Sequence, residues 1–133
     1  MPYLHLDLPL TVAPADRADI AGRLARVYAD VMETNPGRVT VAFRELGENG
    51  VMRTGADGTP EPVVIVNCDI RRGRPPEQRH RLGAAVAELL SEALDWRMDR
   101  VFLEFTQHAG DEFWREGSLL GDWTPEEAAG APS

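Results

Sequence analysis

Apolar and polar residues alternate in four short stretches of the chain, a pattern typical of strands with one buried face. The first stretch spans residues 2–8, and the other three begin near residues 39, 63 and 101. The apolar positions are Leu4, Leu6 and Leu8; Val39, Val41 and Phe43; Val64, Val66, Cys68 and Ile70; and Val101, Leu103 and Phe105. We therefore predict four strands, each buried on one side.

A second spacing, typical of amphipathic helices, separates the strands of each pair. It predicts a helix from about Pro14 to Met32, ended by the turn Asn35-Pro36-Gly37, and a second helix that opens at Pro75-Pro76. The apolar stripes are Ile20, Leu24, Val27 and Val31 in the first helix, and Leu82, Val86, Leu89 and Ala93 in the second. Each half of the chain is thus predicted to be a βαβ unit.

The two halves are related by a constant offset of 62 residues. Subtracting 62 from the apolar positions of the second helix gives those of the first, and the strands match in the same way without a gap. The chain is therefore predicted to be an internal duplication. The expected fold class is α/β (α+β): a duplicated βαβ unit that forms a four-stranded mixed sheet with two helices on one face. The first and third strands are expected to lie antiparallel in the middle.

A chain of 133 residues is long enough for one domain with a proper core. We expect a single domain over residues 1–123. It comprises a βαβ unit at 2–45, a turn-rich connector at 46–62, a second βαβ unit at 63–106 and a C-terminal segment at 107–123. Residues 124–133 are expected to be a mobile tail. The segment's large aromatic residues, among them Trp114 and Trp123, are expected to cover the domain or a neighbouring subunit.

Composition excludes several classes of function. The net charge of −8 makes binding to nucleic acid or to an anionic membrane unfavourable, and no apolar run reaches membrane-spanning length. All 14 basic residues are arginines, which rules out Schiff-base lysine chemistry. The single cysteine, Cys68, gives no disulfide framework and favours a reducing, cytoplasmic location. The three histidines show no metal-ligand spacing, so no metal site and no cofactor are expected.

Pro2 is the first candidate catalytic residue. The first strand begins at residue 2, so we expect no targeting peptide before it, and proline is small enough for Met1 to be trimmed. Trimming would leave a secondary amine at the edge of a rigid sheet, where it can act as an acid or a base. The alternative is that Pro2 only starts a strand at a position that needs no N–H donor.

Arg71 and Arg74 are the second candidates. They lie three residues apart at a strand-to-helix turn, with Gly73 between them, beside the amides that open the second helix. Arginine grips carboxylates with two hydrogen bonds, and the antiparallel pairing places this turn next to Pro2. We expect both arginines to hold a substrate carboxylate and neither to form an ion pair within the chain. The alternative is that the arginines form a solvated basic cluster whose charge balances that of the acidic tail.

The segment Ile70-Arg71-Arg72-Gly73-Arg74, followed by Glu77-Gln78, resembles a motif of the tautomerase superfamily. Over roughly residues 2–120 the chain is similar to the branch with two fused βαβ units, which includes cis-3-chloroacrylic acid dehalogenase and malonate semialdehyde decarboxylase. The resemblance implies a tautomerase-like domain with Pro2 as the catalytic residue and Arg71 and Arg74 as carboxylate ligands. It also implies a homotrimer with the sheets inside and the helices outside, whose interface should be apolar at its core.

Five further residues could line the site. Tyr28 stands where the dehalogenase has a helix histidine, and Glu104 where it has a strand tyrosine; the dehalogenase's water-activating glutamate falls near Arg115 or Glu116. For these positions the alternatives are a core or interface role for Tyr28 and an ion pair for Glu104. His108 suits a loop as well as a pocket rim, and Trp114 suits tail packing as well as a pocket wall.

Three functions remain open from the sequence. The first is a tautomerase that acts on a small 2-oxo or enol carboxylic acid, with neutral Pro2 as the general base. The second is hydration, dehalogenation or decarboxylation of a three-carbon acid, with protonated Pro2 as the general acid. The third is a non-catalytic ferredoxin-like binding module, which shares the order of elements but interleaves its strands.

Overall fold

Four strands and two long helices form the body of the protein. The computed structural model describes residues 2–130. The six elements of the body are β1 (Tyr3–Leu8), α1 (Pro14–Met32), β2 (Thr40–Glu45), β5 (Val64–Arg71), α2 (Pro76–Leu94) and β6 (Val101–His108). The strands lie in the order β2-β1-β5-β6, with β1 antiparallel to β5 and each outer strand parallel to its inner neighbour. The predicted mixed sheet is confirmed, and its strands are not interleaved in the ferredoxin-like order.

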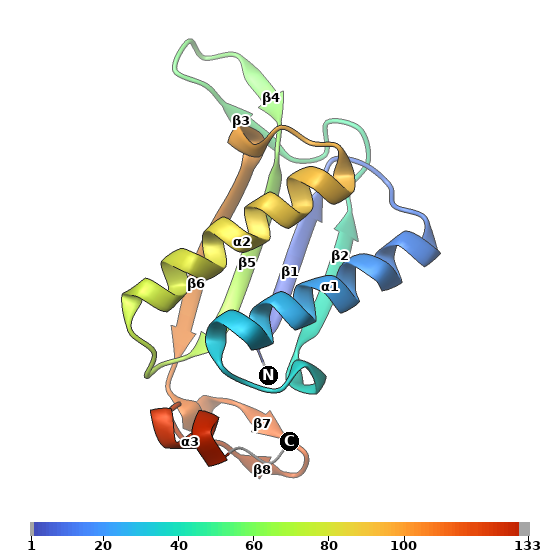
Figure 1. Ribbon diagram of the computed structural model, residues 1–133. Coiled ribbons are helices and arrows are strands. Elements are labelled where there is room, and N and C mark those ends of the chain that lie inside the picture. Colours follow the sequence, from blue (N-terminus) through green and yellow to red (C-terminus); the bar gives the residue numbers. More distant parts are fainter. Residues whose placement is uncertain (1, 131–133) are drawn as a thin grey trace.

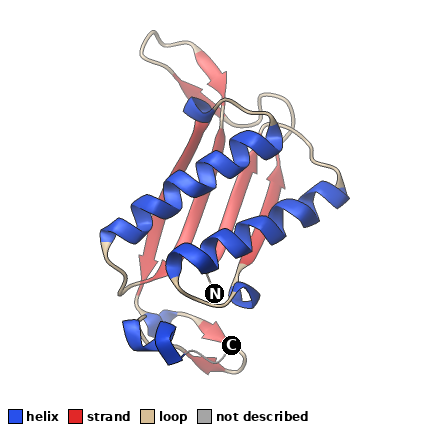
Figure 2. Cartoon of the chain, viewed as in Figure 1, coloured by secondary structure: helices blue, strands red, loops and turns tan. Residues whose placement is uncertain are grey.

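Both long helices pack on the same face of the sheet and leave the other face uncovered (Figures 1 and 2). The core lies between the layers, and the alternating apolar positions of the strands supply its floor. Leu4, Leu6 and Leu8 of β1 are completely buried, as are Leu24 of α1 and Leu82 of α2. Each such side chain stabilises the fold by about 1.5–3 kcal/mol. Burial of these leucines therefore fixes which face of β1 meets the helices.

The duplication extends to details of the backbone. Adding 62 to the bounds of α1 gives those of α2, and the short 3₁₀ turns at Pro36–Arg38 and Met98–Arg100 differ by the same number. Both helices end at a residue in the left-handed conformation, Glu33 with φ 55° and Asp95 with φ 50°. These positions also lie 62 residues apart, so the two units share the way in which their helices end.

The connector and the C-terminal segment lie at opposite ends of the sheet (Figure 1). The connector holds a small hairpin of β3 (Met52–Thr54) and β4 (Pro60–Pro62). The C-terminal segment comprises a 3₁₀ turn at Gly110–Glu112, the hairpin β7 (Trp114–Arg115) and β8 (Ser118–Leu119), and helix α3 (Pro125–Gly130). It lies at the end where β1 begins and where β5 and β6 finish.

The structure gives the predicted tail some order. Residues 125–130 form helix α3 where the sequence suggested a mobile end, while residues 131–133 lie outside the described part of the chain. Of the segment's aromatic residues, Phe113 and Trp123 are buried and Trp114 is 65% exposed. Trp123 therefore covers its own domain, as expected for part of this segment.

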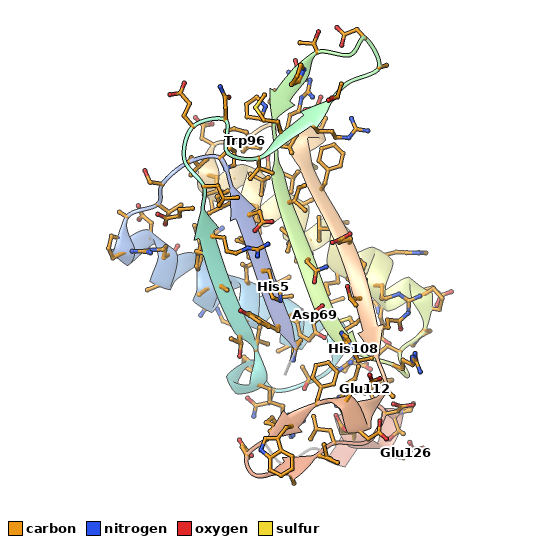
Figure 3. The ribbon with its side chains drawn as sticks, turned by 180° about the vertical axis from the view of Figure 1, so that it is seen from behind. His5, Asp69, Trp96, His108, Glu112 and Glu126 are labelled. Carbon is orange, nitrogen blue, oxygen red and sulfur yellow. The ribbon has the colours of Figure 1, made fainter. Side chains whose placement is uncertain are left out.

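The uncovered sheet face is more polar than we expected. His5 and Asp69 lie side by side on it (Figure 3), with 2.9 Å between His5 Nε2 and Asp69 Oδ2. Nearby, Arg44 is paired with Asp7 on the same face. These side chains satisfy one another within a single chain, because neighbouring strands place opposite charges at adjacent positions.

Among the described residues, no helix is long and apolar enough to cross a membrane.

Candidate functional site

Pro2 is buried at the end of the sheet, immediately before β1. Its carbonyl oxygen accepts a hydrogen bond of 3.1 Å from the backbone N–H of Thr40. Tyr3, the first residue of β1, pairs with Asp69 in antiparallel β5, so Pro2 lies level with the last residues of β5. The juxtaposition predicted from the sequence, with the start of the first strand beside the end of the third, is therefore present. Met1 lies outside the described residues.

Arg74 is buried between the end of α1 and the C-terminal segment. Its Nε donates a hydrogen bond of 2.8 Å to the carbonyl oxygen of Met32, the last residue of α1. Its guanidinium carbon lies 4.7 Å from the centre of the Trp123 ring, a distance typical of a cation–π contact. Burial, together with the charge of Arg71, lowers the pKa of Arg74. A buried cation without an ion-paired carboxylate among the described residues is suited to bind an anion.

Arg71, the last residue of β5, holds a carboxylate of its own chain. Its Nη1 donates hydrogen bonds of 2.7 Å to the carbonyl oxygen of Gly121 and 3.0 Å to Oε1 of Glu127, and its Nη2 donates to Oε2 of the same carboxylate. The expectation that neither arginine forms an ion pair is therefore wrong for Arg71. The sequence pattern missed this because α3 brings Glu127 back across the sheet end from a distant position. The pairing of the basic cluster with the acidic tail, which was the alternative interpretation, accounts for the ion pair between Arg71 and Glu127.

Gly73 allows the C-terminal segment to pack against the arginine turn. Its φ of 126° is open to glycine, and a Cβ at this position would overlap the carbonyl oxygen of Trp123. The backbone N–H of Trp123 donates a 2.9 Å hydrogen bond to the carbonyl oxygen of Arg72. The indole Nε1 of Trp123 is buried and has no hydrogen-bond partner among the described residues. The turn and Trp123 thus form one packed unit with an unused donor.

Arg38 and Arg115 add to the positive charge near the Glu127 carboxylate. Arg38 Nη1 lies 3.6 Å from Glu127 Oε2. Burial and the charge of Arg38 lower the pKa of Arg115, and the charge of Arg71 acts in the same direction. Burial acts to raise the pKa of Glu127, but its hydrogen bond to Arg71 and the charges of Arg71, Arg38 and Arg74 outweigh it and lower the pKa. The end of the sheet therefore carries a cluster of arginine side chains around one carboxylate.

Comparison with known proteins relates this arrangement to a family. A family model described as "Tautomerase enzyme" matches residues 62–122, which include β5, α2, β6 and both candidate arginines. A solved structure of N1, a member of the cis-3-chloroacrylic acid dehalogenase (cis-CaaD) family, aligns with a TM-score of 0.81. The chain has the tautomerase fold. The predicted resemblance to the fused two-unit branch of the tautomerase superfamily is confirmed.

The structural neighbours cover nearly all of the chain at low sequence identity. The N1 alignment covers 96% of this chain and 88% of that one at 20% identity. Native fused 4-OT aligns with a TM-score of 0.77 at 24% identity, over 88% of this chain and 94% of that one. The F6 fused 4-OT, described as an asymmetric trimer, aligns with a TM-score of 0.76 at 20% identity over the same shares. None of the curated proteins matches the sequence.

Within the tautomerase fold, two of the five predicted lining residues lie near the arginines. Tyr28 is buried in the core, and burial raises its pKa, while the charge of Arg74 acts to lower it. Tyr28 is thus a core residue that also lies close to the arginine cluster. His108 pairs in register with Arg71 at the end of β6, with its Nε2 3.8 Å from Asp69 Oδ1 and its ring edge-on to Phe113. It borders the end of the sheet.

The other three predicted lining residues are directed elsewhere. Glu104 is exposed on the uncovered sheet face, where its Oε1 accepts a 2.9 Å hydrogen bond from Asn67. Trp114 is largely exposed, and Glu116 is exposed in the β7–β8 turn with φ 52°. None of the three contacts Arg71 or Arg74 through a hydrogen bond or an ion pair within the described residues. Their proposed lining roles would need contacts that this single chain does not provide.

Sequence reasoning missed three residues of the cluster: Arg38, Trp123 and Glu127. Arg38 and Arg100 occupy equivalent positions in the 62-residue repeat. Their partners nevertheless differ, because Arg38 lies near Glu127 at the site and Arg100 pairs with Glu61. The repeat alone does not predict this difference. Nothing in the spacing of the tail distinguishes Glu127 from its neighbour Glu126. All three contacts join segments far apart in the sequence, which local periodicity does not report.

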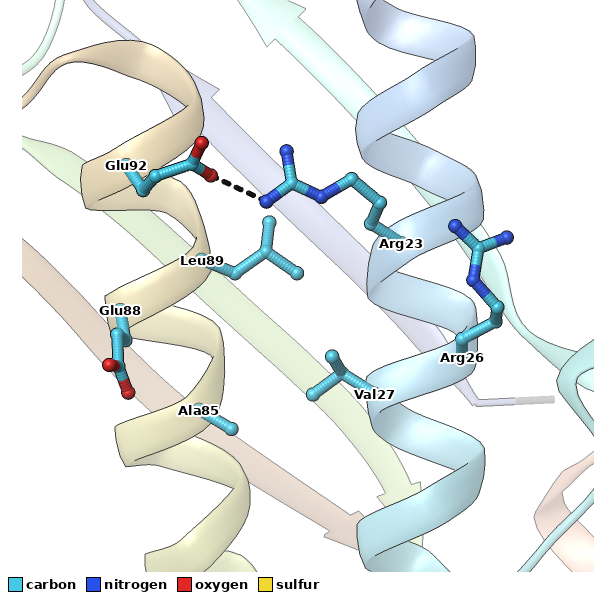
Figure 4. Close-up of a pocket in the computed structure, with 7 residues that line it drawn as sticks. All are labelled: Arg23, Arg26, Val27, Ala85, Glu88, Leu89 and Glu92. Carbon is cyan, nitrogen blue, oxygen red and sulfur yellow. Dashed lines mark hydrogen bonds and ion pairs between the residues drawn. The ribbon is translucent and has the colours of Figure 1, made fainter.

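A separate groove runs along the outside of the helix layer, between α1 and α2 (Figure 4). It is lined by Arg23, Arg26, Val27, Ala85, Glu88, Leu89 and Glu92, and an ion pair between Arg23 and Glu92 crosses it. Its charges are exposed, and neither Pro2 nor the candidate arginines lie in it. In the described part of the chain, no three His, Cys, Asp or Glu side chains gather as a metal site would require. The sheet end is therefore the better candidate site.

Proposed function

We propose that the protein is a tautomerase acting on a small 2-oxo or enol carboxylic acid. Pro2, exposed as the amino terminus by removal of Met1, serves as the general base, and Arg71 and Arg74 bind the substrate carboxylate. The observation that supports this most directly is the pair of hydrogen bonds that Arg71 donates to the Glu127 carboxylate, at the sheet end where β1 begins. An arginine cluster that holds one carboxylate near a prolyl amine has the two functions that the reaction needs.

The proposed reaction moves one proton and leaves the atom count unchanged. The neutral amine of Pro2 takes the hydroxyl proton of the enol and leaves an enolate. An oxygen lone pair then forms the carbonyl bond while the electrons of the carbon–carbon double bond take up the proton of the prolinium ion at carbon, which restores the neutral amine. Arg71 and Arg74 hold the carboxylate still and keep the reacting carbon near Pro2. No cofactor takes part.

Burial around the arginines supports a role in binding. Arg71 and Arg74 are only 5% and 6% exposed, so a carboxylate that reaches them is largely shielded from water. Shielding strengthens its attraction to the guanidinium groups. Trp123 covers Arg74 from one side and can also exclude water from a bound acid.

Hydration, dehalogenation or decarboxylation of a three-carbon acid is the second candidate. The observation that favours it is the Glu127 carboxylate, whose negative charge offsets part of the positive charge of the arginine cluster. With that offset, a protonated Pro2 is stabilised and acts as a general acid. In a non-catalytic binding module, by contrast, the amine of Pro2 would have no role.

We also propose that the chain assembles as a homotrimer through the uncovered sheet face. The support is a sheet with helices on one side only, and the description of the F6 and R7 fused 4-OT neighbours as trimers. Paired polar groups such as His5 and Asp69 would then lie in or near the subunit boundary.

The test combines intact mass with kinetics. Mass spectrometry of the purified protein should show loss of Met1. Wild-type protein should tautomerise enol acids, and Pro2→Ala should lower kcat by at least about a hundredfold, as expected when a general base is lost. Pro60→Ala, in the exposed β3–β4 hairpin, controls for loss of a proline. Turnover of haloacrylates but not of enol acids would favour the second candidate, and retention of Met1 would contradict both enzyme proposals.

A further inference from the structure

We propose that Glu127 is an intramolecular competitor for the carboxylate site, so that helix α3 must release the arginines before a substrate acid can bind. This inference rests on the proposed function, because it takes Arg71 and Arg74 as the ligands of the substrate carboxylate. It adds an autoinhibitory contact that the alternation and spacing of the sequence did not predict.

The contacts of Glu127 are those of a bound carboxylic acid. Both of its carboxylate oxygens accept hydrogen bonds from Arg71, and Oε2 also lies 3.6 Å from Arg38 Nη1. Two parallel hydrogen bonds are the preferred geometry between a guanidinium group and a carboxylate. A substrate acid cannot form the same pair of bonds to Arg71 while Glu127 keeps them. Glu127 and substrate are therefore mutually exclusive on Arg71.

The attachment of α3 makes release feasible. Trp123 is anchored by its backbone hydrogen bond to Arg72 and by burial of its ring. Beyond it, Thr124 and Pro125 are exposed. Among the described side chains of α3, Glu127 is the one that makes polar contacts with the rest of the chain. Breaking the contacts of one side chain thus frees a short helix, while the wall formed by Trp123 stays in place.

Arg74 and Trp123 carry hydrogen-bond donors that suit an external carboxylate. Arg74 contacts a backbone carbonyl and an aromatic ring, and it has no carboxylate at ion-pair distance among the described residues. The indole N–H of Trp123, whose ring covers Arg74, also has no acceptor there. Most buried donors in folded proteins have a partner, so a donor without one calls for an explanation, and a bound ligand supplies it. Arg74 already acts on the charge of Glu127, so an acid that replaces Glu127 would meet the same positive charge.

Calorimetry with pyruvate, a small 2-oxo acid, tests the competition. Glu127→Gln removes the charge that competes for Arg71, and if α3 is docked nine-tenths of the time the apparent Kd for pyruvate should fall about tenfold. Glu127→Ala should have a similar effect. Glu126→Gln is the matched control, because Glu126 is the exposed neighbour on the same helix (Figure 3) and makes no ion pair with the arginine cluster. It should leave the Kd unchanged.

The outcomes separate this inference from the proposed function. Unchanged or weaker pyruvate binding in both Glu127 variants would overturn the competition, as would a fall in kcat with no change in KM, since that would assign Glu127 to the chemistry. Arg71→Ala tests the site itself and should weaken pyruvate binding most in the Glu127→Gln background, because in the wild type it also releases the competing Glu127. If Arg71→Ala has no effect in either background, the carboxylate site fails, whatever the behaviour of Glu127.

Discussion

Arg71 and Glu127 lie 56 positions apart in the sequence and form a two-point ion pair at the end of the sheet. The pair joins the last residue of β5 to α3, at the sheet end where Pro2 lies. It shows that the arginine cluster can hold a carboxylate, and every experiment on the site therefore has to account for Glu127.

The first prediction concerns the titration of Glu127. Arg71, Arg38 and Arg74 outweigh the effect of burial and lower its pKa below the ordinary glutamate value. The ion pair should therefore be fully present above the unfolded-state pKa of ~4.3 and should be lost only as the pH falls through the lower folded-state pKa. Carbon-13 NMR of the Glu127 side-chain carboxyl should show a titration midpoint below the ordinary glutamate value. A midpoint at that ordinary value would contradict the ion pair.

The second prediction concerns Arg74. A charge-assisted hydrogen bond to a carboxylate contributes roughly 1.5–3 kcal/mol, so Arg74→Ala should lower kcat/KM by about ten- to a hundredfold. Arg72→Ala is the control, because Arg72 is exposed in the same turn and should leave kcat/KM nearly unchanged. Circular dichroism should show that both variants fold. Full activity of Arg74→Ala would remove Arg74 from the site.

The third prediction concerns the core beneath the site. Leu6 is completely buried on a central strand, so Leu6→Ala should lower the free energy of unfolding by about 2–5 kcal/mol. Leu46→Ala removes the same atoms from a side chain that is 52% exposed, and it should change the free energy by less than about 0.5 kcal/mol. Urea denaturation measures both. Similar losses in the two variants would mean that the position of β1 in the core is misassigned.

The fourth prediction concerns the amine of Pro2 after removal of Met1. An ordinary α-amino group titrates near ~8. Burial and the charges of Arg71 and Arg74 favour the neutral form, and Glu127 opposes them. We expect the arginines to prevail and the pKa to lie below that of an ordinary amine. Nitrogen-15 NMR decides this, because a pKa at or above ~8.5, higher than that of an ordinary α-amino group, would favour the hydratase, dehalogenase or decarboxylase proposal.

The fifth prediction concerns assembly. Multi-angle light scattering at micromolar concentration should give three times the chain mass of 14.7 kDa. Because the proposed contact involves the uncovered sheet face, reversing the charge of Arg44 by Arg44→Glu should place two acids together with Asp7 and weaken assembly. Arg26→Glu, on the helix side, should not. A monomeric wild-type protein would exclude the trimer.

The fold could be predicted almost completely because its determinants are local. The alternation in the strands and the apolar stripes through Leu24 in α1 and Leu82 in α2 depend on residues a few positions apart. The internal repeat then indicated how the two βαβ units pair in one sheet. The juxtaposition of Pro2 and Arg71 then followed from antiparallel strands alone. The polar sheet face was less predictable, because pairs such as Asp7 and Arg44 become evident only once the register between strands is known.

The site could be predicted only in part, because much of it is built by the last residues of the chain. Trp123 and Glu127 reach the arginines through turns and a two-stranded hairpin too short to leave a periodic signature. Glu104 was placed by alignment to a relative rather than by the geometry of this chain, and the structure turns it toward Asn67. Contacts of this kind join distant segments and leave no local signal in the sequence.

The 62-residue offset has a consequence for stoichiometry. Subtracting 62 from Arg71 and Arg74 gives Pro9 and Val12, and adding 62 to Pro2 gives Val64, so the opposite end of the sheet lacks all three groups. One half of the chain contributes the proline and the other contributes both arginines. A reagent directed at the site would therefore modify one position per chain instead of two. Each half, produced separately, would lack the groups that only the other half provides.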